Sequence, residues 1–151
     1  MMTREQMRRR TRHFAVQAQQ FVAPLRHNIH GRALGRRLIR SAAAVGANYQ
    51  AACVARSRDE FIARLEAIEA KADESAYWME AIVAGDLVPE EKAAPLFEEA
   101  DTIAALMAAS RRSLTTRQAS RGRTPSRTPH NAKTRPSTPN PTVLPWPPSR
   151  N

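Results

Sequence analysis

The first 116 residues of this chain contain almost none of the residues that interrupt helices. Eight of the eleven prolines lie after residue 117, and the five glycines are dispersed singly. Because proline and glycine are the strongest local breakers of regular structure, their scarcity favours long uninterrupted elements. Aromatic residues make up only 5% of the chain, and alanine supplies much of its apolar content, which favours closely packed helices over a sheet core. The sequence therefore predicts an all-α domain.

Apolar residues recur at three- and four-residue steps along four segments, as expected for amphipathic helices. Ser57 followed by Glu60 predicts a capping box at the start of the third segment, and Gly85 predicts a stop at its end. The links are short, so the segments should alternate in direction as an up-down-up-down four-helix bundle. The predicted helices cover residues 3–22, 31–55, 57–85 and 89–114.

Charge divides the chain into three blocks. Residues 1–58 hold twelve arginines and one acid, residues 59–116 hold thirteen acids and five bases, and residues 117–151 hold seven bases and no acid. The last block is rich in Pro, Ser and Thr, a composition that cannot bury enough apolar surface to become ordered. We therefore predict a bundle over 1–116 and a disordered, basic, Pro-rich tail over 117–151. The tail fits either a solvated extension or a cationic arm for polyanions, with Trp146 available to stack.

The second predicted helix contains an alanine-rich stretch, RSAAAVGANYQAACVA, at residues 40–55. Small side chains let two helix backbones approach more closely than the usual separation of about 8–10 Å, and here they cover every face of the helix. We therefore expect neighbouring helices to surround this segment. Arg40 and Asn48 would then need partners, because burial of an unpaired polar group is costly. Asp73 and Glu74 on the third helix are the natural candidates.

Two groups of residues resemble the halves of a family signature. The first is Arg40-Ser41, Val45, Ala47-Asn48-Tyr49, Ala55, Ser57 and Phe61, and the second is Asp73-Glu74, Tyr77-Trp78, Met79 and Glu80. Over residues 9–112 the chain resembles the small bacterial four-helix-bundle proteins known as 23S rRNA intervening-sequence proteins. It departs from the family pattern at Ala51, Ala70 and Lys71, where acids are commoner.

The resemblance carries expectations about assembly and partners. It implies a left-handed bundle that associates into a ring, typically a homopentamer. Some relatives are encoded inside insertions in ribosomal RNA genes, and others accompany retroelement reverse transcriptases and bind nucleic acid. The expected structural polar network consists of Arg40, Ser41, Asn48, Tyr49, Asp73 and Glu74.

Three consecutive bulky residues, Tyr77, Trp78 and Met79, predict a second buried surface. Each helical step rotates the side chain by about 100°, so the three cannot all face one core. Self-association would bury the surface left over, and we predict an oligomer interface at these residues. A half-exposed Trp on a monomer is the alternative, because scattered surface apolar residues are common.

The residues that carry catalysis or bind metals are not arranged in any recognisable motif. His13, His27, His30 and His130 show no metal-ligand spacing, and Cys53, the only cysteine, fits a small core residue. The charge-free stretch at 41–55 is shorter than the about 20 apolar residues of a membrane span. We therefore expect a non-enzymatic cytoplasmic protein with no cofactor, metal, membrane partner or small-molecule substrate.

The leading functional hypothesis is a non-catalytic oligomer that binds nucleic acid, with structured RNA favoured. Phosphate neutralisation would dominate its affinity, and the shape of RNA would be read instead of base edges. The alternative is a structural or adaptor homo-oligomer with a protein partner, whose arginines face acidic surfaces within or between subunits. The candidate nucleic-acid-binding residues are Arg8, Arg9, Arg10, Arg12, Arg32, Arg36 and Arg37.

Overall fold

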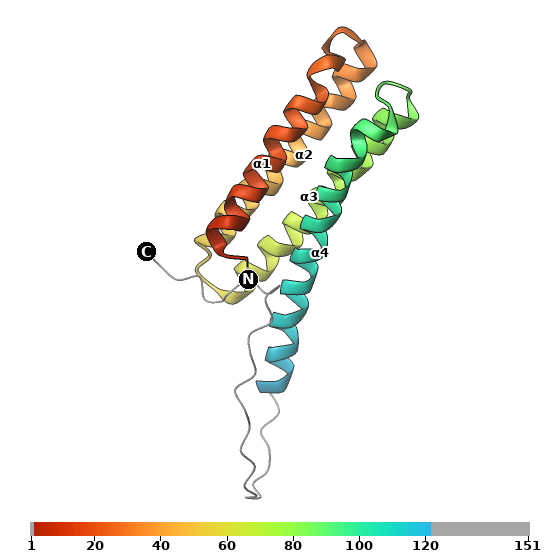
Figure 1. The fold of residues 1–151 in the computed structure, drawn as a ribbon. Helices are drawn as coiled ribbons and strands as arrows, with labels where there is room; N and C mark the ends of the chain where they lie inside the picture. The colour runs from red at the N-terminus through yellow and green to blue at the C-terminus, as the bar shows by residue number, and fades with distance from the viewer. Residues whose placement is uncertain (1, 122–151) are drawn as a thin grey trace, which may run out of the picture.

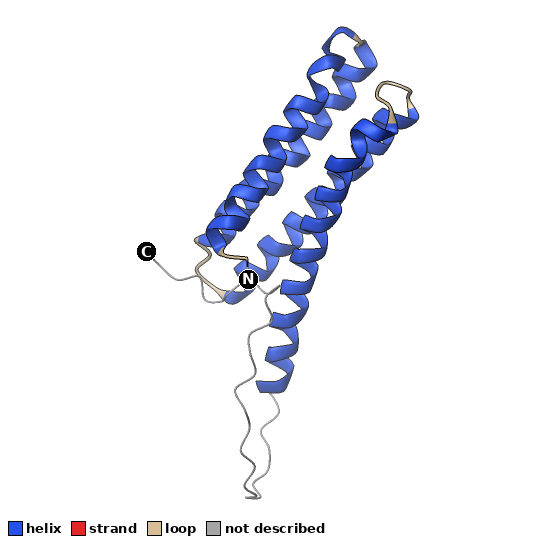
Figure 2. Cartoon of the chain, viewed as in Figure 1, coloured by secondary structure: helices blue, strands red, loops and turns tan. Residues whose placement is uncertain are grey.

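The computed structural model describes residues 2–121 of the chain, and within them it contains four α-helices and no strand (Figure 2). Successive helices run antiparallel and form an up-down-up-down bundle, as predicted (Figure 1). A short 3₁₀ helix, Ala23–His27, links the first two. The α-helices are α1 (Arg4–Val22), α2 (Ile29–Cys53), α3 (Arg58–Ala84) and α4 (Glu90–Arg121).

Polar side chains fix the starts of the first three helices. Thr3 forms a reciprocal capping box with Gln6 at the start of α1. The side chain of Asn28 accepts hydrogen bonds from the amides of His30 and Gly31, so α2 begins about two residues earlier than the sequence pattern predicts. Ser57 caps α3 by accepting from the amide of Glu60.

Two predicted details at the ends of α3 differ in the structure. The carboxylate of Glu60 accepts from the amide of Arg56, not from that of Ser57, so the capping box is only half formed. Gly85 is the C-cap of α3, but its φ is −82°. The left-handed conformation falls instead on Asp86, with φ of 54°, a residue type that tolerates this region better than most.

α4 continues past the other three helices and ends at Arg121, beyond the predicted boundary at residue 116 (Figure 1). Its last buried residue is Leu114, whose carbonyl accepts a hydrogen bond from the guanidinium of Arg58. Residues 115–117 and 119–121 are exposed, so this end of α4 is a solvated helical extension. The predicted disorder of the tail concerns mainly residues 122–151, which lie outside the described part of the chain.

One apolar core runs through the interior of the bundle and is supplied by all four helices. Its residues lie at the three- and four-residue spacing that predicted each helix. Inter-helix polar contacts within this core are few, and the hydroxyl of Ser75 donates to that of Ser41 at 2.9 Å. The largest fully buried apolar side chains include Met7, Phe14, Leu38, Leu65, Ile68, Met79, Ile82, Ile103 and Met107.

The alanine-rich part of α2 is not surrounded within this chain, contrary to our expectation. Ala42 is fully buried, whereas Ala43 and Ala47 are exposed, because α2 packs on α1 and α3 and its remaining side faces solvent. Small residues do allow a close approach to α1. A Cβ added at Gly35 would lie 3.1 Å from the Cβ of Val22, which is tighter than ordinary contact.

Candidate nucleic-acid interface

The outer side of the α1–α2 pair carries two shallow hollows of about 310 and 290 Å³. The first is lined by residues that include Arg8, Thr11, Arg12, Ala43, Gly46 and Ala47. The second is lined by residues that include Gln19, Ala23, Arg26, Arg32, Gly35 and Arg36. On each helix these residues recur at three- and four-residue steps and so share one face. The two hollows are parts of one surface, which we call the α1–α2 seam.

Small residues form the floor of the first hollow. A Cβ added at Gly46 would lie 3.5 Å from the carbonyl oxygen of Thr11, so the backbones of α1 and α2 approach closely there. Ala43 and Ala47 continue this floor and are exposed. In the second hollow, Val22 and Ile39 lie beside Gly31 and Gly35. The long arginine side chains at the edges of both hollows can lie across the seam or reach out from it.

Positive charge dominates the seam, which has five arginines and, among the described residues, no acid in its lining. Within residues 2–121, the side chains of Arg12, Arg32 and Arg36 make no ion pair or hydrogen bond. Arg8 pairs with the exposed carboxylate of Glu5 at 3.5 Å. Arg26 donates to the carbonyl oxygen of Ala23. These cations are therefore available to an anion from outside the chain.

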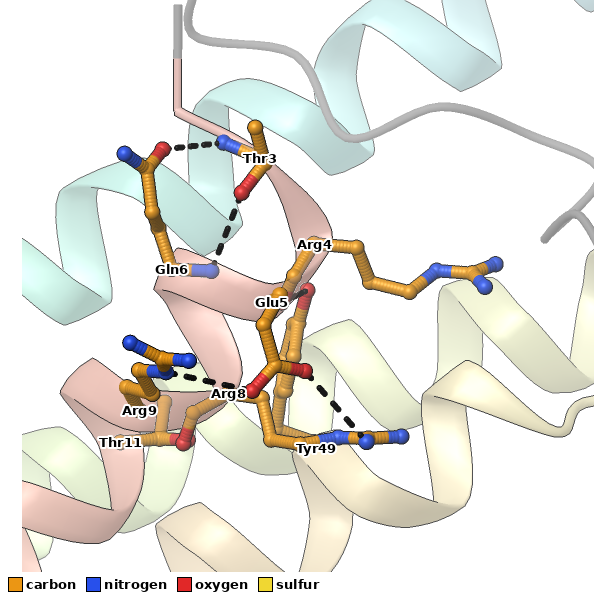
Figure 3. A network of polar contacts seen from close by, with 8 residues as sticks. All are labelled: Thr3, Arg4, Glu5, Gln6, Arg8, Arg9, Thr11 and Tyr49. Carbon is orange, nitrogen blue, oxygen red and sulfur yellow. Dashed lines mark hydrogen bonds and ion pairs between the residues drawn. The ribbon is translucent and has the colours of Figure 1, made fainter. Parts of the chain in front are cut away.

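A polar network holds the start of α1 at one end of the seam (Figure 3). The Thr3–Gln6 capping box fixes the first turn, and Glu5 contacts both Arg8 and Arg9. Tyr49, from α2, donates its hydroxyl to the carbonyl oxygen of Arg4 at 3.4 Å. Burial of the Tyr49 hydroxyl raises its pKa well above the ordinary value. The Tyr49 contact thus ties α1 to α2 beside the first hollow.

Three arginines predicted for nucleic-acid binding lie apart from the seam lining. Arg10 forms a bidentate pair with Glu99 of α4, with distances of 2.6 and 2.8 Å, and these hydrogen bonds raise the pKa of Arg10. Arg37 lies over the ring of Trp78 at 4.9 Å from its centroid. Arg9 is highly exposed and contacts Glu5 at 3.3 Å. Arg10 therefore connects helices, and Arg37 belongs to the α2–α3 side of the bundle.

The residues predicted to form a polar network are not joined as expected. Arg40 is exposed, and none of its contacts within the described residues joins it to Asp73 or Glu74. Asn48 accepts from Arg64 of α3 at 3.1 Å and donates to the carbonyl oxygen of Ala44. Arg64 was not among the predicted network residues, although it lies sixteen residues from Asn48 across a short turn.

Asp73 and Glu74 differ in environment despite being adjacent. Glu74 accepts from Lys71 at 2.5 Å and from the indole of Trp78 at 3.4 Å. The Lys71 hydrogen bond holds the pKa of Glu74 below its ordinary value. Partial burial raises the pKa of Asp73, and the nearby carboxylates of Glu69 and Asp101 add to that effect.

The three bulky residues predicted for an oligomer interface face different directions. Met79 is fully buried in the core of the bundle. Trp78 is half-buried, and Tyr77 is 59% exposed. The two aromatic rings meet edge to face, with centroids 4.8 Å apart. Tyr77 and Trp78 are thus the pair that a partner could contact, and Met79 serves the interior of its own chain.

The described residues contain no group of three or more His, Cys, Asp or Glu placed to hold a metal ion. His13, His27 and His30 are exposed, and Cys53 is half-buried. His130 lies outside the described range. No helix between residues 2 and 121 has a stretch long and apolar enough to cross a membrane.

Arg26 belongs to the seam but was not among the predicted binding residues. It falls in the 3₁₀ link between α1 and α2, which the sequence pattern identified only as a break between helices. Arg26 lies four residues after Val22, which also lines the second hollow, and this helical spacing is the signal that would have predicted it.

Comparison with known proteins supports the fold. No family model matches the chain, and no curated protein matches it. A crystal structure of a protein of unknown function from the S23 ribosomal protein family of Bacteroides thetaiotaomicron VPI-5482 has the same fold, with a TM-score of 0.62. Its sequence is 22% identical, and the match covers 69% of this chain and 96% of that one. At this identity the likeness establishes a shared architecture.

Proposed function

We propose that this protein is a non-catalytic helical bundle that binds structured RNA through the α1–α2 seam. The observation that carries the proposal is the set of seam arginines without acidic neighbours in the lining. Phosphate groups supply most of the affinity of proteins for nucleic acids, and arginine binds them with two donors at once. From Arg32 to Gln50 the α2 side of the seam extends about 27 Å at 1.5 Å per residue, enough for several phosphates.

Structured RNA suits this surface because the seam presents arginine side chains and backbone groups, and not a helix or strand that enters a groove to read base edges. Proteins recognise A-form helices mainly by shape and by contacts to phosphates and 2′-hydroxyls. The binding set that we propose is Arg8, Arg12, Arg26, Arg32 and Arg36. This set leaves out three of the predicted residues, Arg9, Arg10 and Arg37. Arg10 is paired with Glu99, and the other two lie off the seam.

Self-association is the second part of the proposal. The exposed Tyr77 and half-buried Trp78 are apolar surface beyond what one bundle needs. The resemblance to intervening-sequence proteins favours a ring, and a pentamer in particular, which would repeat the seam around an axis. The cytoplasmic location expected from the sequence belongs to the same proposal.

A gel shift over a salt series tests the binding proposal. Affinity for unrelated structured RNAs should fall steeply between about 50 and 200 mM salt. Replacing Arg12, Arg32 and Arg36 together with Ala should reduce the slope of log affinity against log salt by about 2 to 3, because each lost phosphate contact lowers it by about 0.7–0.9. Replacing Arg40, Arg56 and Arg112, which are exposed and off the seam, removes the same charge and should change the slope little.

Three results would contradict the proposal. Absence of salt-sensitive binding at submicromolar protein would favour the alternative, a self-associating adaptor whose seam contacts an acidic protein surface. Complete loss of binding on deletion of residues 122–151 would move the binding site from the seam to the tail. Equal losses in the two triple variants would show that only total charge matters.

A further inference from the structure

The outer side of the α3–α4 pair carries a groove that the proposed function does not use. Its volume is about 460 Å³, within the about 300–1,000 Å³ common for binding pockets. The apolar lining includes Met79, Val83 and Phe97, and α4 contributes Ala93 and Ala94. Since apolar side chains dominate the floor, an occupant with apolar side chains would be favoured.

Three acids complete this α3–α4 groove. Glu80, Glu90 and Glu98 line it, and no basic residue from the described part of the chain does so. Glu80, Glu90 and Glu98 are exposed. Negative charge around an apolar floor repels nucleic acid and favours a cationic peptide with large apolar side chains.

The chain itself contains such a peptide. Residues 143–151 read VLPWPPSRN, which combines two aliphatic residues, Trp146, three prolines and Arg150. Residues 122–151 hold five bases and no acid. We propose that residues 143–151 bind in the α3–α4 groove of their own chain, with Trp146 on the apolar floor and Arg150 near the three glutamates.

Two physical features favour this occupant. Proline-rich segments lose little conformational entropy when they bind, because proline already restricts them to extended conformations. Tryptophan buries about 150–250 Å² and is the side chain that contributes most in such pockets. Tethering also raises the local concentration of the peptide into the millimolar range when the connection can span the distance.

The connection is long enough. α4 runs 27 residues from Ala94 to its end at Arg121, or about 40 Å at 1.5 Å per residue. The 21 residues from 122 to 142 can extend up to about 70 Å at 3.3 Å per residue. A segment attached to the end of α4 can therefore return along the bundle to the groove. This inference is independent of the proposed RNA binding.

The fluorescence of Trp146 tests the inference in the full-length protein. The chain has two tryptophans, so a Trp78→Phe background leaves Trp146 as the only indole. We expect a blue-shifted emission maximum and a quenching constant with acrylamide several-fold lower than in denaturant. Replacing both Glu90 and Glu98 with Lys should move the emission to that of exposed tryptophan and raise the quenching constant to the denatured value.

A matched variant controls for charge. Glu91 and Asp101 are exposed residues of α4 outside the groove lining, and replacing both with Lys changes the net charge by the same amount. This control should leave the emission of Trp146 unchanged. Far-UV circular dichroism checks folding of each variant, and if the double groove variant unfolds, Ala94→Lys fills the exposed part of the groove without removing an acid.

Three outcomes would overturn the inference. Trp146 could emit as exposed tryptophan in the parent protein, or the control variant could shift the emission as much as the groove variant. A blue shift that disappears on dilution would assign the groove to the segment of a second copy. A signal independent of protein concentration supports binding within one chain.

Discussion

The α1–α2 hairpin and the α3–α4 hairpin each have a hollowed surface between their two helices, and the two surfaces differ in charge and in floor. The α1–α2 seam has arginines over a floor of mostly glycine and alanine, with Val22 and Ile39 in its second hollow. The α3–α4 groove has glutamates over a floor that includes Phe97 and Val83. Both hairpins use the same inward apolar spacing and contribute to one core. The shared interior sets the architecture, and the residues between helices on the outside determine which class of ligand each surface favours.

The largest effects should come from the shared interior. Phe14 of α1 and Ile103 of α4 are fully buried. Phe14→Ala should lower the free energy of unfolding by about 3–5 kcal/mol and Ile103→Ala by about 2–5 kcal/mol, because each leaves a cavity. Chemical denaturation followed by circular dichroism and by fluorescence should give one coincident transition for each variant. Two separated transitions would show that the hairpins are independent units with separate cores.

A smaller effect is expected where the two hairpins meet through charge. Arg10 and Glu99 are both partly buried, with side chains 29% and 23% exposed. Arg10→Ala should cost about 1–2 kcal/mol, because it leaves a partly desolvated carboxylate without its charged donor. A double-mutant cycle with Glu99→Ala measures the coupling between them.

Arg9 provides the control for the Arg10 variant. Its side chain is 80% exposed and contacts Glu5 on the surface, so Arg9→Ala should change stability by no more than about 0.5 kcal/mol. A coupling energy near zero for Arg10 and Glu99 would mean that the opposite charges of the two hairpins do not help to hold them together.

The sequence was sufficient to predict the bundle because the helical signals agree with one another. Apolar spacing, the predicted cap at Ser57 and the scarcity of breakers all depend on local chemistry. The end of α4 was predicted too early because Arg117 and its neighbours have no apolar partner to mark a boundary. The start of α2 depended on the cap at Asn28, which the apolar pattern does not reveal.

The candidate sites were predicted less completely because they depend on pairings across helices. Helical spacing could place Arg12, Arg32 and Arg36 on outer faces, but only tertiary structure shows that α1 and α2 bring them to one seam. Arg10 could not be separated from them by sequence, because its partner lies 89 residues away in Glu99. The expected pairing of Arg40 with Asp73 or Glu74 was wrong, because Arg40 lies on a solvent-facing side of α2 and is exposed.

The smallest predicted effect concerns two adjacent acids of α3, Asp73 and Glu74, whose pKa values are shifted in opposite directions. Asp73 has a raised pKa, so its ionised form is disfavoured in the folded state. Glu74 has a lowered pKa, with the Lys71 hydrogen bond as its largest cause, so its ionised form is favoured there. At neutral pH, Asp73→Asn should therefore stabilise the bundle and Glu74→Gln should destabilise it, each by no more than about 0.5 kcal/mol for groups this exposed.

The pH dependence of the stability change in each variant tests the direction of the corresponding pKa shift. The benefit of Asp73→Asn should shrink as the pH falls and vanish below about 4, where the wild-type aspartate is protonated in both the folded and the unfolded states. The cost of Glu74→Gln should persist to lower pH and vanish only as the pH passes below the lowered pKa of folded Glu74. Urea denaturation across this range measures both. If the two variants change the free energy of unfolding in the same direction at neutral pH, Asp73 and Glu74 do not lie in environments of opposite charge. The contrast between the two hairpins is then confined to their outer surfaces.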